Sequence, residues 1–146
     1  MVTSVVVQAV ARLLLAPILM IAFAILVKGY AEVGDGFSAG AIAALGVLLH
    51  YVAFGRATTE RLLPIRALPA ACFAALLLAL ALATGPLVFG DPVLTYAPSP
   101  GAEVVHLGTL EVIGAVAFDV AVFVIVMGAA LGIIHALARQ AEEIRE

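Results

Sequence analysis

Four long apolar runs alternate with short polar stretches along the chain, and each run is long enough to cross a lipid bilayer as a helix. The pattern predicts spans at about 5–27, 36–54, 69–88 and 109–135. A stretch rich in Pro and Gly separates the last two spans and rules out a regular helix there. We therefore expect an all-α integral membrane protein, with four transmembrane helices forming a single domain over residues 1–146.

The composition agrees with a location in lipid. Hydrophobic residues make up 65% of the chain and charged residues 12%, and the mean hydropathy is +1.24. Such a chain has too little polar surface to cover a soluble domain, and its net charge of -3 gives no indication of nucleic-acid binding. The first run lacks the basic start of a secretory signal peptide and contains Arg12, so we interpret it as a retained span.

The distribution of basic residues predicts the orientation of the chain. Short loops rich in Lys and Arg stay on the cytoplasmic side of the membrane. Such residues follow the second and fourth spans, at Arg56, Arg61, Arg66, Arg139 and Arg145. The opposite side carries only Lys28. Both termini are therefore expected to be cytoplasmic.

The connection between the first two spans combines glycines with charged residues. Gly34 and Gly36 flank Asp35 there, and Lys28 stands at the end of the first span. Glycine permits a tight turn and a close backbone approach, and we expect Asp35 to cap the following helix. Lys28 is interpreted as an interfacial anchor or one half of an ion pair in the hairpin, with a role as an ion ligand as the alternative.

Small residues recur at the four-residue spacing that lets membrane helices approach each other closely. Gly36 and Gly40 have this spacing at the start of the second span, and Gly128 and Gly132 have it in the fourth. Each pair either marks a helix contact or arises by chance in a helix rich in Gly and Ala.

Asp119 is the strongest candidate for a role in ion movement, because a carboxylate inside an apolar span is costly. It lies about ten residues into the fourth span, or about 15 Å along a helix axis, near the middle of a hydrocarbon layer about 30 Å thick. We expect it to be protonated, paired or facing water. Arg12 is its best candidate partner within the chain.

Two further polar residues are candidates for the ion path. His50 lies on a face of small residues, where it either relays protons or only forms a hydrogen bond to a neighbouring helix. Glu111 is expected in the first turn of the fourth helix, where the helix dipole alone accounts for it; a cation attractor at the mouth of a path is the alternative.

The segments Gly29–Gly40 and Phe118–Phe123 carry a resemblance to a known family. They resemble two segments of the B-type (MnhB/MrpB) component of multi-subunit Mrp/Mnh-type cation/proton antiporters, which read G-H-x-x-P-G-G-G-F-x-x-G and L-F-D-x-G-V. The first segment matches at Gly29, Gly34, Gly36, Phe37 and Gly40. It departs from the family pattern at Tyr30, Val33 and Asp35.

The resemblance implies a subunit of a complex in a bacterial or archaeal cell membrane that exchanges Na⁺ for H⁺. Its partners would be the other subunits, and no cofactor or bound metal is implied. One alternative is a structural membrane subunit of a related hydrogenase or complex I-like assembly, and another is an independent small transporter. The sequence contains no Ser/His/Asp set and no metal-ligand cluster that would indicate an enzyme.

Overall fold

The computed structural model describes residues 4–29, 34–62, 67–95, 106–107, 110–111 and 114–143. Four of its helical segments are long and apolar enough to span a membrane, which confirms the predicted fold class. They are α1 (Val5–Lys28), α2 (Gly36–Phe54), α4 (Leu68–Thr84) with the 3-10 helix η2 (Gly85–Phe89) that continues it, and α5 (Gly114–Glu143).

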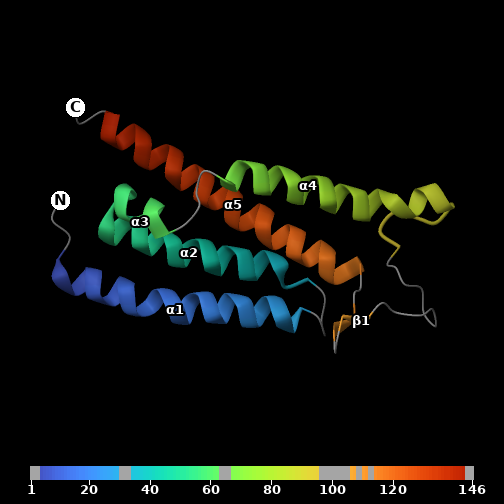
Figure 1. Ribbon diagram of the computed structural model, residues 1–146, viewed down its shortest axis with the longest axis horizontal. Coiled ribbons are helices and arrows are strands. Elements are labelled where there is room, and N and C mark those ends of the chain that lie inside the picture. Colours follow the sequence, from blue (N-terminus) through green and yellow to red (C-terminus); the bar gives the residue numbers. More distant parts are fainter. Residues whose placement is uncertain are drawn as a thin grey trace.

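The long helices lie side by side in the order α1, α2, α5 and α4 (Figure 1). The last helix in the sequence therefore packs between α2 and α4. Helices α1 and α4 keep outer faces with exposed large side chains, such as Leu13 and Phe73, that suit lipid or a neighbouring protein of a complex. Both termini lie at one end of the row (Figure 1), and the assignment of that end to the cytoplasm stays a prediction.

Glycines on two faces of α2 allow both of its neighbours to come close. A Cβ atom on Gly40 would lie 2.8 Å from the backbone oxygen of Phe123 on α5, and one on Gly36 would overlap the backbone oxygen of Asp119. On the other side, a Cβ atom on Gly46 would lie 2.7 Å from Cγ2 of Ile18 on α1. Gly36 and Gly40, which are four residues apart, thus both lie at the contact between α2 and α5.

Apolar side chains fill the remaining contacts between the helices. Val47 and Tyr51 of α2 pack with Leu131 of α5, and a second cluster joins α4 to α5 through Ala75, Ala79 and Ala121. Because these alanines are small, α4 and α5 can pack closely. Close packing matters here because the hydrophobic effect drives little association between helices in lipid.

One short helix and one pair of short strands differ from the expectations. The basic connection after α2 forms a helix, α3 (Arg56–Leu62), which begins after Gly55 ends α2 with a φ of 75°. Strands β1 (His106–Leu107) and β2 (Leu110–Glu111) pair in antiparallel fashion, so α5 begins at Gly114. Thr109, the predicted start of the fourth helix, lies outside the described residues.

The position predicted for Glu111, in the first turn of the fourth helix, is wrong. Glu111 belongs to β2 and pairs with His106. Its backbone takes part in a strand pair three residues before α5 begins, and therefore cannot also be helical.

Candidate functional site

Asp119 lies where the glycine-rich hairpin meets α5. Its side chain is 5% exposed, and its Oδ2 atom accepts a hydrogen bond of 2.8 Å from the backbone N–H of Gly34. Gly34 has a φ of 124°, a conformation that side chains other than glycine rarely adopt. The hairpin therefore needs a glycine at the residue that holds the carboxylate.

Gly29 leaves room for the same carboxylate from the end of α1. A Cβ atom on Gly29 would lie 3.0 Å from Oδ2 of Asp119 and 3.5 Å from the Cβ of Asp35. Two acidic side chains therefore approach Gly29, and Lys28 precedes it in the chain. The Nζ atom of Lys28 lies 3.4 Å from Oδ2 of Asp35, as an ion pair of the hairpin.

The predicted capping role of Asp35 is wrong. Asp35 does occupy the N-cap position of α2, but its side chain makes no capping hydrogen bond. Its backbone is already helical, with φ -86° and ψ -3°, whereas a capping side chain usually needs an extended backbone. The carboxylate instead faces Lys28, and the Ser38 hydroxyl donates to the backbone oxygen of Asp35 at 2.9 Å.

The charge on Asp119 is compensated only weakly by the described residues. One backbone N–H donates to it, and the structure describes no ion pair between Asp119 and a basic side chain. A single hydrogen bond does not offset the cost of holding a carboxylate out of water.

The predicted pairing of Asp119 with Arg12 is wrong, and the helix that carries Asp119 begins later than predicted. Because α5 begins at Gly114, Asp119 lies only about 7.5 Å along the helix axis from its start. Arg12 precedes Gly29 by 17 residues, or about 25 Å along α1. An arginine side chain does not span that distance.

Arg12 and His50 instead meet at the other end of α2, around Phe54. The guanidinium carbon of Arg12 lies 5.1 Å from the centre of the Phe54 ring, and the His50 ring lies 5.0 Å from it. His50 is 4% exposed, and its Nδ1 atom has no hydrogen-bond partner among the described residues. These two candidates therefore form a group of their own, separate from Asp119.

Among the other residues of the sequence motifs, only Gly128 lies at a close helix contact that the structure describes. Phe37 is 64% exposed. A Cβ atom on Gly128 would overlap the Cys72 sulfur of α4, whereas one on Gly132 would meet nothing within 4 Å. The family departures Tyr30 and Val33 lie outside the described residues.

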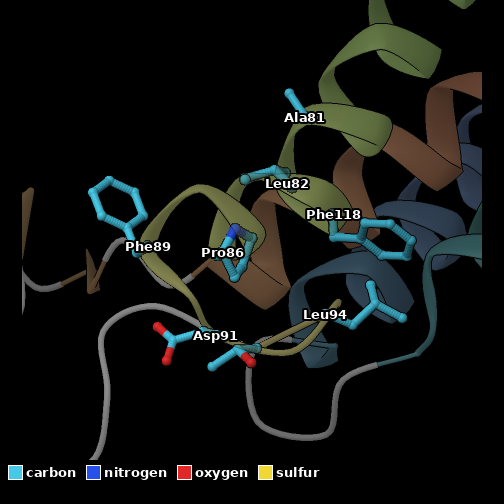
Figure 2. Close-up of a pocket in the computed structure, with 10 residues that line it drawn as sticks. Ala81, Leu82, Pro86, Phe89, Asp91, Leu94 and Phe118 are labelled. Carbon is cyan, nitrogen blue, oxygen red and sulfur yellow. The ribbon is translucent and has the colours of Figure 1, made fainter.

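A cavity of about 330 Å³ lies between η2 and the start of α5 (Figure 2). Its walls are mostly apolar and include Phe118, with Asp91 as their charged member. Leu94, which lines it, has a φ of 63° and donates its N–H to the backbone oxygen of Ala83. Asp119 is not among the lining residues, so the cavity is separate from the carboxylate site.

The sequence interpretation missed a polar cluster at α3. Glu60 accepts a hydrogen bond from Arg56 and lies beside His135 of α5. The spacing of Arg56 and Glu60, four residues apart, was the available signal for a helix at this place.

Comparison with known proteins relates the chain to components of antiporters. Residues 6–132 match the MnhB family, described as a domain related to the MnhB subunit of Na⁺/H⁺ antiporters. The chain is 32% identical over 123 residues to the B component of the Na⁺/H⁺ antiporter of Bacillus subtilis, covering 84% of this chain and 85% of that one. It is also 32% identical over 110 residues to the B component of the Na⁺/H⁺ antiporter of Alkalihalophilus pseudofirmus, covering 75% of each chain.

A third relative is a longer protein. The chain is 34% identical over 121 residues to the combined A/B component of a probable K⁺/H⁺ antiporter of Rhizobium meliloti, which covers 83% of this chain and 12% of that one.

Proposed function

Because this chain belongs to the MnhB family, we propose that it is the B-type component of a multi-subunit complex that exchanges a monovalent cation, Na⁺ in the first instance, for H⁺. It is a multi-pass protein of the cell membrane, and its partners in this proposal are the other subunits of the complex. Within the complex, Asp119 is the group that binds the proton or the cation.

One observation carries the proposal: the two segments with the family resemblance meet at the Asp119 carboxylate. Gly34 of the glycine-rich hairpin donates to it, and Gly29 and Gly36 have no side chain that would displace it or its backbone. A buried carboxyl group with one neutral donor is a suitable place to exchange a proton for a cation.

The same hydrogen bond links ion binding to the hairpin between α1 and α2. An ionised carboxylate accepts a stronger hydrogen bond from the Gly34 N–H than a protonated carboxyl group does. Protonation of Asp119 therefore loosens the hairpin, and ionisation tightens it. In this way the charge of one residue affects the position of the segment that covers it.

Replacement of Asp119 by Asn in the assembled complex tests the proposal. The Asn side-chain oxygen still accepts from Gly34, whereas the group no longer titrates. We expect normal assembly and a loss of cation/proton exchange of at least about a hundredfold, the lower end of the range for removal of an essential proton-transfer group. The measurement is cation-dependent dissipation of a pH gradient in inverted membrane vesicles.

Two further variants separate transport from structure. Asp119→Ala removes the acceptor as well as the charge, so we expect it to weaken assembly in addition to exchange. Asp91→Asn, which changes an exposed carboxylate at the separate cavity, serves as the matched control and is expected to retain activity. Full activity of Asp119→Asn refutes the role in exchange, and loss of assembly in that variant shows that the carboxylate mainly holds helices together.

A further inference from the structure

A second polar cluster lies at the opposite end of α2 from Asp119, where α3 contacts both α2 and α5. Glu60 of α3 accepts a hydrogen bond from Nε of Arg56, and its Oε1 atom lies 2.9 Å from Nδ1 of His135 on α5. Two side chains from two elements, Arg56 of α3 and His135 of α5, thus meet at the Glu60 carboxylate. The exchange reaction proposed for Asp119 does not use this cluster.

Side chains beside the cluster are well shielded. Thr59 of α3 is 1% exposed, and its hydroxyl donates to the backbone oxygen of Gly55 at 2.9 Å. Tyr51 of α2 is 7% exposed and packs with Leu131 of α5. The short helix therefore buries part of its own surface in the closed arrangement seen here.

The contact between His135 and Glu60 depends on a proton. The Nδ1 atom of His135 is buried and makes no hydrogen bond of good geometry, although the Glu60 oxygen is 2.9 Å away. On a neutral imidazole with its proton on Nε2, that nitrogen presents a lone pair to the carboxylate and the contact is repulsive, whereas a neutral ring with its proton on Nδ1 donates an uncharged hydrogen bond. An imidazolium presents an N–H group together with a positive charge, and the contact becomes an ion pair.

Glu60 supplies a steady negative charge to this contact. The hydrogen bond from Arg56 holds the pKa of Glu60 below its ordinary value of 4.5, so this carboxylate stays ionised above that pH. Imidazole is the side chain that ordinarily changes its charge between about pH 5 and 8.

The other polar groups around the contact come from α2, α3 and α5. In addition to Arg56 and Glu60, α3 carries Arg61, and α5 carries Arg139 one turn after His135. Helix α2 contributes the buried Tyr51 hydroxyl, and α4 contributes the apolar Leu68 to the adjoining core. Among the side chains that the structure describes here, Glu60 is the carboxylate that favours a charged imidazole.

We propose that α3 is a proton-dependent latch: protonation of His135 forms the ion pair with Glu60 and holds α3 against α5, and loss of that charge weakens the hold. The latch lies at the end of the molecule that the basic residues assign to the cytoplasm. A rise in pH on that side would therefore loosen α3. This inference does not depend on whether Asp119 exchanges ions.

Thiol labelling at Thr59 in the assembled complex tests the latch. The background is Cys72→Ala, which removes the single cysteine of the chain. Thr59→Cys places a thiol at the buried position, and Thr58→Cys places one at its exposed neighbour. The ratio of their labelling rates with a water-soluble maleimide cancels the intrinsic pH dependence of the thiol. We expect this ratio to fall about threefold or more from pH 8.5 to pH 6, as a partly exposed ion pair forms.

Two variants of His135 decide whether the histidine is responsible. In His135→Gln the ratio should stay high at both pH values, and in His135→Lys, which keeps a positive charge, it should stay low at both. A wild-type ratio that does not change with pH, or a fall that persists in His135→Gln, overturns the proposal. Because labelling does not require transport, this result is independent of the Asp119→Asn result.

The latch should also open at low pH, where the Glu60 carboxylate takes up a proton and loses its charge. The hydrogen bond from Arg56, which lies in α3 with Glu60, keeps this carboxylate ionised until the pH falls through the lowered pKa, and below that pH the ion pair with His135 is lost. We therefore expect the labelling ratio to rise again below pH 4.5 in the wild type. In Glu60→Gln the ratio should be high at every pH, and a low ratio in that variant contradicts the latch.

Discussion

At Gly36 the absence of a side chain lets α2 reach the backbone of α5 beside Asp119. A Cβ atom there would overlap the Asp119 backbone oxygen, which cannot move aside as a flexible side chain can. We expect Gly36→Ala to lower the free energy of unfolding by about 1–3 kcal/mol, the range for overpacking at a close contact. The measurement is the free energy of unfolding of the purified chain in mixed micelles, from a titration with a denaturing detergent.

Gly132 provides the matched control, because it lies in α5 and a Cβ atom there would meet nothing within 4 Å. We expect Gly132→Ala to be neutral, or to stabilise the helix by up to about 1 kcal/mol, since alanine is the better helix former. Equal losses in the two variants would contradict the contact at Gly36.

That Asp119 needs a polar partner away from water could be predicted from the sequence, but the identity of that partner could not. A carboxylate in an apolar run is unusual enough to identify the residue. Its hydrogen-bond donor is a backbone N–H of Gly34, a group that almost every residue has and that no side-chain pattern reveals. The expected pairing with Arg12 failed because it was chosen by charge, without knowledge of how the helices lie relative to one another.

The crossing of α4 and α5 depends on a match in size between Cys72 and Gly128. The Cys72 sulfur occupies the space where a Cβ atom of residue 128 would lie. We expect Gly128→Ala to destabilise the contact by about 1–3 kcal/mol, as other small-to-large changes do in packed cores. Adding Cys72→Ala should recover most of this loss, because it removes the sulfur that the new methyl group would meet.

A double-mutant cycle measures this coupling between the two helices. It compares the free energies of unfolding of the wild type, both single variants and the double variant in the same mixed micelles. Effects that simply add would show that the crossing does not depend on this pair. Gly132→Ala combined with Cys72→Ala is the control, and additive effects are expected there.

The long helices could be predicted from the sequence, because a segment that crosses a membrane must be apolar and must form all its backbone hydrogen bonds within itself. The short elements did not, because they depend on tertiary contacts. Helix α3 is seven residues long and lies against α2 and α5. The pairing of β1 with β2 delays the start of α5 and therefore places Asp119 closer to a helix end than expected.

The orientation of the whole molecule can be tested with two exposed threonines at opposite ends. Thr58 lies in α3, and Thr95 follows η2 at the other end of α4. In a Cys72→Ala background, an impermeant thiol reagent added to intact cells should label Thr95→Cys and leave Thr58→Cys unlabelled, because basic loops stay cytoplasmic. Lysed cells should label both, and labelling of only Thr58→Cys in intact cells would invert the topology.

At the scale of the molecule, the resemblance found in two short segments is confirmed by the family match over residues 6–132. The order of the helices in space, with α5 between α2 and α4, could not be predicted from the sequence. Four apolar spans can pack in several orders. Small residues such as Gly40 and Gly46 indicate that another helix can pack closely against a face, but they do not identify that helix.

Helix α2 is the shortest of the four spans, with 19 residues against 24 in α1. Its length of about 28 Å barely matches a hydrocarbon layer about 30 Å thick. Held by close contacts on both sides, it has little freedom to tilt or slide on its own. A thicker bilayer would therefore draw both of its ends toward the acyl chains, so that the Asp119 hairpin and the α3 latch would each respond to lipid chain length.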